Sequence, residues 1–179
     1  KTSSVVTDHI EKFEEKGIRL KSGNFLPADL IVTATGLILE SFGGVKMSVD
    51  NKPIEASDTY TYRSLMYSGI PNLVSCFGYI NASWTLKADL TSEYVCRLIK
   101  HMKKNDFEVV CPQFEVDIEE SDDFLNGFSS GYIKRAADSQ PKQGKEKPWI
   151  NLQDYFKDWI DIKFKKLDDG YLNFSKLEK

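Results

Sequence analysis

Cysteine and histidine are scarce in this chain of 179 residues, and their spacing excludes several kinds of site. The three cysteines are Cys76, Cys96 and Cys111, and the two histidines are His9 and His101. No two cysteines have the spacing of metal ligands, and an odd, scattered set does not make the disulfide framework of a small secreted protein. We therefore expect no metal site and a reduced cytoplasmic setting, with Cys76 and Cys96 as small buried hydrophobic residues.

The sequence also lacks a long apolar run and an excess of charge of one sign. No run reaches the roughly 18 residues that a membrane-spanning helix requires. The 24 basic and 27 acidic residues give a net charge of −3, which does not indicate nucleic acid as a partner. We expect a soluble, cytoplasmic globular protein, with peripheral membrane association as an open alternative. Because the chain begins at Lys1 without a methionine, we also expect a piece of a longer protein.

The apolar patterning divides the chain into four stretches. Residues 1–36 predict the return strands of a meander that leads to an Ala-Thr-Gly motif. Residues 37–71 predict a loop-rich connector, because glycine and proline separate its short segments. Residues 72–104 predict a strand, a glycine and a long helix, and residues 105–179 predict a mostly helical extension that closes with an edge strand. The expected fold class is α/β, with few strands and one dominant helix.

Two short apolar runs are typical of strands that are buried on both faces. Residues 30–32 precede Thr35 and Gly36, and residues 73–77 precede Gly78. A glycine at the end of such a strand permits a sharp turn or the close approach of a ligand, because it has no Cβ. An ordinary structural turn explains each glycine equally well.

Residues 86–103 have the strongest helical pattern, with apolar side chains at four-residue spacing. The start of this helix has two explanations. Free N–H groups and the helix dipole favour an anion there, and Lys87 adds positive charge. Alternatively, the helix is an ordinary core helix that is capped by Asn81, Ser83 or Thr85, and Lys87 extends to solvent.

Two motifs lie in the order found in flavoproteins with two dinucleotide-binding domains. The first is D-x-x-V-x-A-T-G at residues 29–36, and the second is P-N-L-x-x-x-x-G at residues 71–78. The stretch GYINASWTLKADLTSEYVCRL, residues 78–98, resembles the flavin-containing monooxygenases, especially the Baeyer–Villiger type that includes the ethionamide-activating enzyme. Shorter stretches are similar as well, namely FGG at 42–44, SGYIKRA at 130–136, PKQG at 141–144 and PW at 148–149.

This resemblance implies the C-terminal portion of a monooxygenase that depends on FAD and NADPH. Such an enzyme oxygenates a ketone, or a sulfur or nitrogen centre, with O2 through a flavin C4a-peroxide. The helix start then faces the pyrimidine edge of the flavin, where backbone N–H groups stabilise negative charge. The cofactor-binding positions implied in this way are Thr35, Gly36, Gly78, Thr85, Leu86 and Lys87. The positions implied for the substrate pocket are Asn81, Ser83 and Trp84.

Several parts of such an enzyme have no counterpart in the sequence. No G-x-G-x-x-G turn for a pyrophosphate occurs, and the family's fingerprint histidine and flavin-side arginine are missing. We therefore expect no catalytic residue here, and an isolated chain that is inactive and holds neither FAD nor NADPH. Its expected partners are the missing N-terminal FAD- and NADPH-binding region and a second copy of itself. A disulfide reductase relative is disfavoured, because no paired cysteines occur. The alternative from another class is a non-catalytic interaction module derived from a flavoprotein fold.

Overall fold

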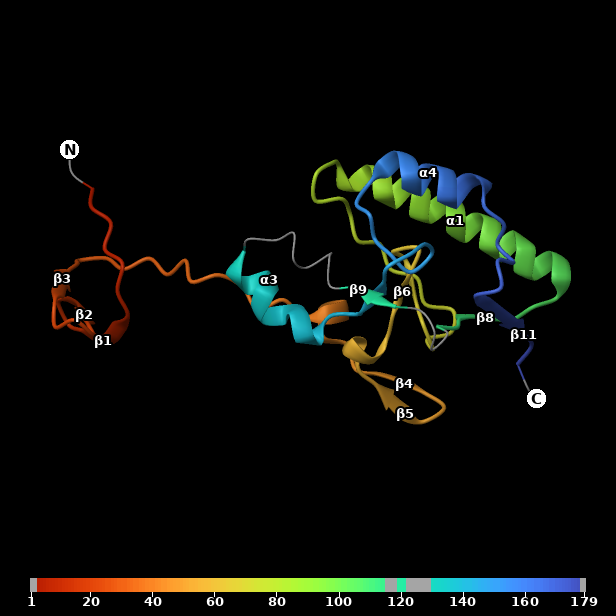
Figure 1. Cartoon of the computed structure of the whole chain (residues 1–179). Coiled ribbons are helices and arrows are strands. Elements are labelled where there is room, and N and C mark those ends of the chain that lie inside the picture. Colours follow the sequence, from red (N-terminus) through yellow and green to blue (C-terminus); the bar gives the residue numbers. More distant parts are fainter. Residues whose placement is uncertain (1–2, 115–118, 122–129, 178–179) are drawn as a thin grey trace. The chain divides into compact units, whose positions relative to one another are not determined.

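The computed structural model describes residues 3–114, 119–121 and 130–177 (Figure 1). Its contacts divide it into two compact units, Lys1–Leu37 and Ile38–Lys179. Both helices and strands are present, as the α/β prediction requires. The strands are more numerous than the few that were expected, and none of those described is longer than five residues.

The first unit contains a three-stranded antiparallel sheet in the order β1–β2–β3. Strand β1 is Ile10–Glu14, β2 is Gly17–Leu20 and β3 is Phe25–Pro27. The turn between β2 and β3 is closed by the Gly23 N–H, which donates to the Leu20 carbonyl oxygen at 2.9 Å. The predicted meander is confirmed over these strands.

The buried strand predicted at residues 30–32 is wrong. Residues 28–37 form no strand, and Leu30 and Val32 are 81% and 79% exposed. A strand that is buried on both faces needs neighbouring strands to pair its N–H and carbonyl groups. The described residues provide no such neighbour for this stretch.

Residues 47–54 form a small β-hairpin, although a loop was predicted for this part of the connector (residues 37–71). Strands β4 (Met47–Val49) and β5 (Lys52–Ile54) pair in antiparallel register around Asp50 and Asn51. Both turn residues have positive φ, 51° and 61°, which is the conformation of a type I′ turn. This turn matches the right-handed twist of the two strands.

A second hairpin follows, made by β6 (Thr61–Tyr62) and β7 (Met66–Tyr67). Its loop contains Arg63 and Ser64, which both have positive φ. All four strand residues are buried or half-buried. This hairpin therefore belongs to the core and not to a surface connector.

The strand predicted at residues 73–77 is also wrong, because this stretch has irregular backbone. Individual hydrogen bonds hold this stretch and the adjacent Asn72 against neighbouring segments. The Ser75 N–H donates to the Leu65 carbonyl oxygen at 2.8 Å, and the side-chain oxygen of Asn72 accepts from the Val110 N–H at 2.9 Å. The neighbouring segments thus offer single hydrogen bonds and no continuous edge for a strand.

The dominant helix is confirmed as α1, Trp84–Asn105. Leu90, Tyr94 and Leu98 of the predicted stripe are buried. The helix ends at Asp106, which adopts the left-handed conformation, and two lysines in the last turn favour the negative end of the dipole. Cys96 lies on the opposite face of this helix from the stripe and is exposed. Cys76, in the irregular stretch, is exposed too, so the prediction that both cysteines are buried is wrong.

The C-terminal part mixes helices and strands and is not mostly helical. Strand β8 (Val109–Pro112) pairs with β11 (Leu172–Ser175), which confirms the predicted closing strand. Helix α4 is Tyr155–Phe164, close to the predicted position. Of the other helix predicted there, at about 124–138, residues 124–129 lie outside the described residues. The remaining elements are η1 (Ser41–Gly44), η2 (Ala56–Asp58), β9 (Glu120–Ser121), α3 (Gly131–Ala136), η3 (Ala137–Ser139) and β10 (Gln143–Gly144).

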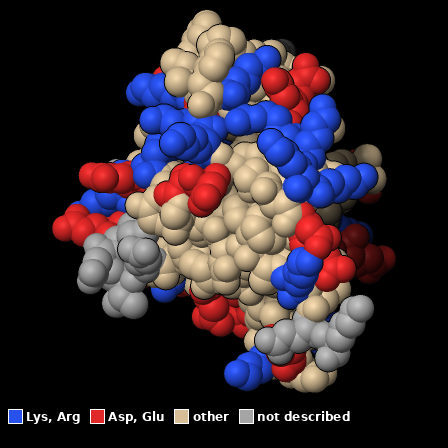
Figure 2. Space-filling model, turned by 90° about the vertical axis from the view of Figure 1, so that its right-hand side faces the viewer, with Lys and Arg blue, Asp and Glu red and all other residues tan. Residues whose placement is uncertain are grey.

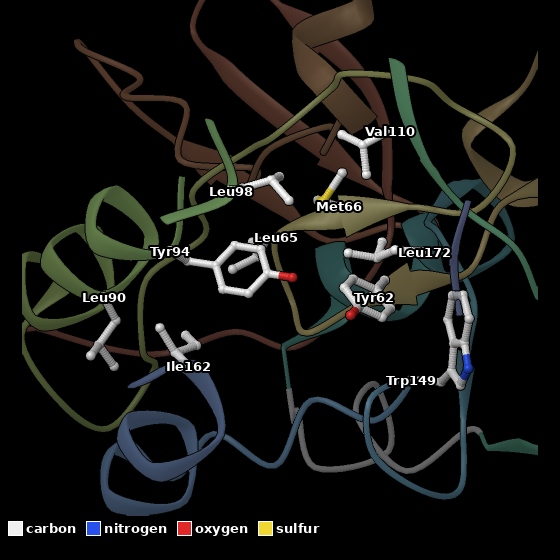
Figure 3. Close-up of a cluster of buried hydrophobic side chains, with 10 residues drawn as sticks. All are labelled: Tyr62, Leu65, Met66, Leu90, Tyr94, Leu98, Val110, Trp149, Ile162 and Leu172. Atoms are coloured by element: carbon white, nitrogen blue, oxygen red, sulfur yellow. The ribbon is translucent and has the colours of Figure 1, made fainter. Parts of the chain in front are cut away.

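The core of the second unit lies between α1, α4, the β6–β7 hairpin and the β8–β11 pair (Figure 3). Trp149 is 1% exposed and meets the Tyr62 ring edge-on at 5.4 Å. Burying an aromatic or aliphatic side chain of this size stabilises a fold by about 1.5–3 kcal/mol. The ten buried side chains of this core are Tyr62, Leu65, Met66, Leu90, Tyr94, Leu98, Val110, Trp149, Ile162 and Leu172.

Candidate functional site

The start of α1 is capped by Ser83, one of the three residues that the sequence offered. Its Oγ accepts a hydrogen bond from the Thr85 N–H at 3.4 Å and lies 2.7 Å from the Thr85 hydroxyl oxygen. Its carbonyl oxygen accepts from the Leu86 N–H at 3.2 Å. Two of the N–H groups expected to face a cofactor are therefore engaged within the cap, through bonds at the long end of the normal range. Their assignment to cofactor binding stays a prediction.

Gly78 is a glycine because the indole of Trp84 lies directly against it. A Cβ added at Gly78 would be 2.2 Å from Cγ of Trp84, far inside van der Waals contact. Trp84 also contacts Phe77, with ring centroids 5.3 Å apart, and remains 57% exposed. In this chain the close approach at Gly78 is thus made by a side chain of the helix start itself.

Lys87 is buried, and its side chain reaches α4 instead of solvent. Its Nζ lies 2.7 Å from Oδ2 of Asp158, and only 1% of the residue is exposed. Lys147 Nζ contacts the other oxygen, Oδ1, also at 2.7 Å, and the Tyr79 hydroxyl donates to Oδ2 at 3.0 Å. The alternative in which Lys87 extends to solvent is therefore wrong.

The charges in this cluster do not balance, because two ammonium groups share one carboxylate. Burial acts to raise the pKa of Asp158, but the charges of Lys87 and Lys147 outweigh it and hold this pKa below its ordinary value. Burial lowers the pKa of Lys87, against the attraction of Asp158. The cluster consequently ties the first turns of α1 to α4.

A second buried charged cluster surrounds Arg63 in the β6–β7 hairpin. Its guanidinium forms ion pairs with Asp161 at 2.6 Å and with Asp169 at 2.9 Å. The Tyr62 hydroxyl accepts from Arg63 Nε at 3.0 Å and donates to Asp169 at 2.7 Å. This cluster joins the hairpin to the chain on both sides of the end of α4.

Of the remaining predicted positions, Leu86 is half-buried and the others are exposed. Asn81 lies just before the cap of α1. Thr35 and Gly36 belong to the first unit, and Gly36 has a φ of +96°, which suits a glycine turn. The second unit brings Gly78, Ser83, Trp84 and Thr85 together at the helix start. Their roles toward a cofactor or substrate stay predictions.

Asp158 and Lys147 were missed in the sequence because Asp158 lies 71 residues from Lys87. One signal could have found them. On α4 the acids Asp158 and Asp161 alternate with Trp159, Ile160 and Ile162 in helical order, so an inward apolar face necessarily includes an acid. A buried acid needs a buried cation as a partner.

The side chains exposed at the helix start combine apolar and polar groups. Phe77, Ile80 and Trp84 are 42%, 53% and 57% exposed beside the polar groups of Asn81 and Ser83. Such a surface suits a ring system with apolar faces and a polar edge. The described residues include no glycine-rich turn that could bind the pyrophosphate.

The structure also bears on metal sites and on membrane-spanning helices. Within residues 3–114, 119–121 and 130–177, no group of three or more histidine, cysteine, aspartate or glutamate side chains comes together as metal ligands. In the same part of the chain, no helix combines the length and the apolar character needed to cross a membrane.

Comparison with known proteins identifies relatives for nearly the whole chain. It is 48% identical over 174 residues to a probable FAD-binding monooxygenase, AlmA, of an Acinetobacter species. It is 47% and 49% identical to the FAD-containing monooxygenases EthA of Mycolicibacterium smegmatis and Mycobacterium tuberculosis. These matches cover 96–97% of this chain and 35% of each relative. No family model and no solved structure matches the chain. The chain is thus related to the FAD-containing monooxygenases, whose C-terminal portion it resembles and of whose length it spans about a third.

Proposed function

We propose that this chain acts as the C-terminal part of an FAD- and NADPH-dependent monooxygenase, which oxygenates a ketone or a sulfur or nitrogen centre. The observation that carries the proposal is the 47–49% identity to FAD-containing monooxygenases along almost the entire chain. The exposed aromatic and polar side chains at the start of α1 support it, because they suit one edge of a flavin ring.

Within this proposal, FAD supplies the activation of O2, and the chain shapes the surroundings of the ring. Trp84, Asn81 and Ser83 line the substrate side and exclude water from it. The Thr85 and Leu86 N–H groups lie near the edge where negative charge develops. Lys87 acts at a distance, because its ammonium group is held by Asp158.

A non-catalytic interaction module remains the second candidate. It is favoured by the missing pyrophosphate turn and by apolar side chains that stay exposed in both units, including Leu30 and Ile38 at 81% and 90%. Such a module would bind a partner without any flavin.

A chimera distinguishes the two functions. This chain would replace the homologous third of EthA from Mycolicibacterium smegmatis. We expect the purified chimera to retain FAD and to oxidise NADPH with oxygen uptake when a sulfide or ketone is added. A folded chimera without flavin would refute the proposal and favour the interaction module.

A variant of the chimera tests the assignment of Trp84. Trp84→Ala should change the relative rates for small and bulky ketones, because the indole is assigned to the substrate side. NADPH-driven flavin reduction, followed separately by stopped flow, should stay nearly unchanged. Equal loss of both would show that Trp84 supports the fold alone.

The isolated chain is the matching control. We expect it to purify without the visible absorption of bound flavin and not to oxidise NADPH, because the pyrophosphate turn is missing from its sequence. Retention of FAD by the chain alone would contradict this expectation.

A further inference from the structure

Helix α4 exposes an apolar stripe on the face that points away from the core. Phe156, Ile160 and Phe164 are 75%, 51% and 67% exposed. They are spaced four residues apart, so they follow one another along a single face of the helix. Ile162, on the opposite face, is 1% exposed and belongs to the core. These three exposed side chains are called the α4 stripe below.

The charges of α4 are sorted between its two faces. Its acids, Asp158 and Asp161, are buried and paired with cations of the core. The exposed charged residues on α4 and directly after it are Lys157, Lys165, Lys166 and Asp168, and Lys157 pairs with Asp154, the cap of α4, at 3.7 Å. Exposed lysines on α4 and just after its end therefore accompany the α4 stripe and outnumber the exposed acids there.

The last turns of α1 extend this cationic area. Lys100, Lys103 and Lys104 are exposed there. Helix α4 runs alongside α1 and contacts it (Figure 1). Figure 2 shows Lys and Arg side chains gathered in a band across the upper part of the molecule, the level at which the two helices lie in Figure 1.

We propose that the outward face of α4 binds the surface of an anionic phospholipid bilayer. The α4 stripe enters the boundary between headgroups and acyl chains, and the lysines beside it contact lipid phosphates. A helix with an aromatic apolar face and flanking lysines is the arrangement that binds in the plane of such a surface. A second copy fits less well, because a two-fold interface over this stripe would bring the lysines of both copies together.

Co-sedimentation with lipid vesicles tests the proposal on the full chain. We expect the protein to sediment with vesicles that contain phosphatidylglycerol and to stay in solution with pure phosphatidylcholine. Added salt should weaken the binding, because the attraction to anionic lipid is screened. A folded chain that ignores phosphatidylglycerol vesicles would overturn the proposal.

Two double variants separate the apolar contribution from the charged one. Phe156→Ser with Phe164→Ser, and Lys165→Glu with Lys166→Glu, should each reduce the vesicle affinity at least about tenfold. The matched controls are Val45→Ser, which removes another exposed apolar side chain, and Lys52→Glu on β5. Both controls should bind as the wild type does, and thermal unfolding verifies that every variant is folded.

Other occupants of this face give different results. If a second copy covers it, light scattering will show a dimer that the phenylalanine variant dissociates, and vesicles will not bind. If the phenylalanine variant binds as the wild type does, the α4 stripe does not insert. Either result overturns the proposal. Neither involves flavin, so they are independent of the proposed oxygenase function.

Discussion

Lys87 shows how one buried carboxylate decides the role of a cation near a helix start. Its ammonium group lies on Asp158, a residue that Lys147 and Tyr79 also contact. The Thr85 and Leu86 N–H groups donate to Ser83, so the helix start has a filled cap and a lysine that is paired inside the protein.

Substitution of Lys87 should lower the stability of the fold by an amount that depends on whether the new side chain is negative or neutral. Lys87→Glu places a second carboxylate beside Asp158 and should lower the free energy of unfolding by about 3–5 kcal/mol. Lys87→Met leaves Lys147 and Tyr79 on the carboxylate and should cost about 1–3 kcal/mol. Urea unfolding followed by circular dichroism measures both values. Equal losses in the two variants would show that Lys87 contributes packing and not charge.

Gly78 and Trp84 should be energetically coupled. Gly78→Ala forces the indole away from its position and should destabilise the fold by about 1–3 kcal/mol, the usual cost of overpacking. In a Trp84→Ala background the same change should cost almost nothing, because the obstructing ring is gone. A double-mutant cycle measures the coupling, and additive losses would refute the contact.

At the scale of elements, the contact between α1 and α4 should be sensitive to acid. The pKa of Asp158 in the folded state lies below its ordinary value of 3.8, because the nearby ammonium groups outweigh the effect of burial. Its contribution to stability is complete above pH 3.8 and is lost as the pH falls through the lower folded-state pKa. Asp158→Asn should therefore reduce stability at pH 7 and flatten its decline below about pH 4. Identical acid unfolding curves for the two proteins would contradict this.

Helices were more predictable than strands, because a helix carries its own hydrogen bonds. The stripe from Leu90 to Leu98 was enough to locate α1. The strands predicted at residues 30–32 and 73–77 depended on neighbours that the sequence cannot specify. The β4–β5 hairpin was missed although Asp50-Asn51 is a turn signal, because its strands are only three residues long.

At the candidate site, too, a local feature was predictable from the sequence, and a contact between distant segments was not. Ser83 was among the expected caps, since capping is local in sequence. The pairing of Lys87 with Asp158 depends on the packing of α4 on α1, which periodicity alone does not determine. The sequence therefore predicted the cap of α1, but not the direction of the Lys87 side chain.

At the scale of the whole molecule, exposed apolar residues between 30 and 38 predict self-association. Leu30, Val32 and Ile38 are 79–90% exposed, and the backbone between them has no strand partner among the described residues. Such a stretch can pair with the same stretch of a second copy. We expect a concentration-dependent dimer in light scattering.

Charged substitutions test this prediction. Leu30→Asp with Val32→Asp should shift the equilibrium to monomer, whereas Val45→Asp, at another exposed apolar position, should leave the dimer intact. A wild-type chain that is monomeric at every concentration would contradict the prediction.

The pairing of β8 with β11 has a consequence for the order in which the protein can form. Leu172, in β11, belongs to the same core as Tyr62, and Asp169, three residues before it, is the second carboxylate paired with Arg63. During synthesis, the hairpin and α1 leave the ribosome well before these residues do. Until residues 169–175 have been synthesised, Arg63 lacks one of its two counterions and the core lacks the side chain of Leu172. The core of the second unit therefore cannot close before β11 has been synthesised.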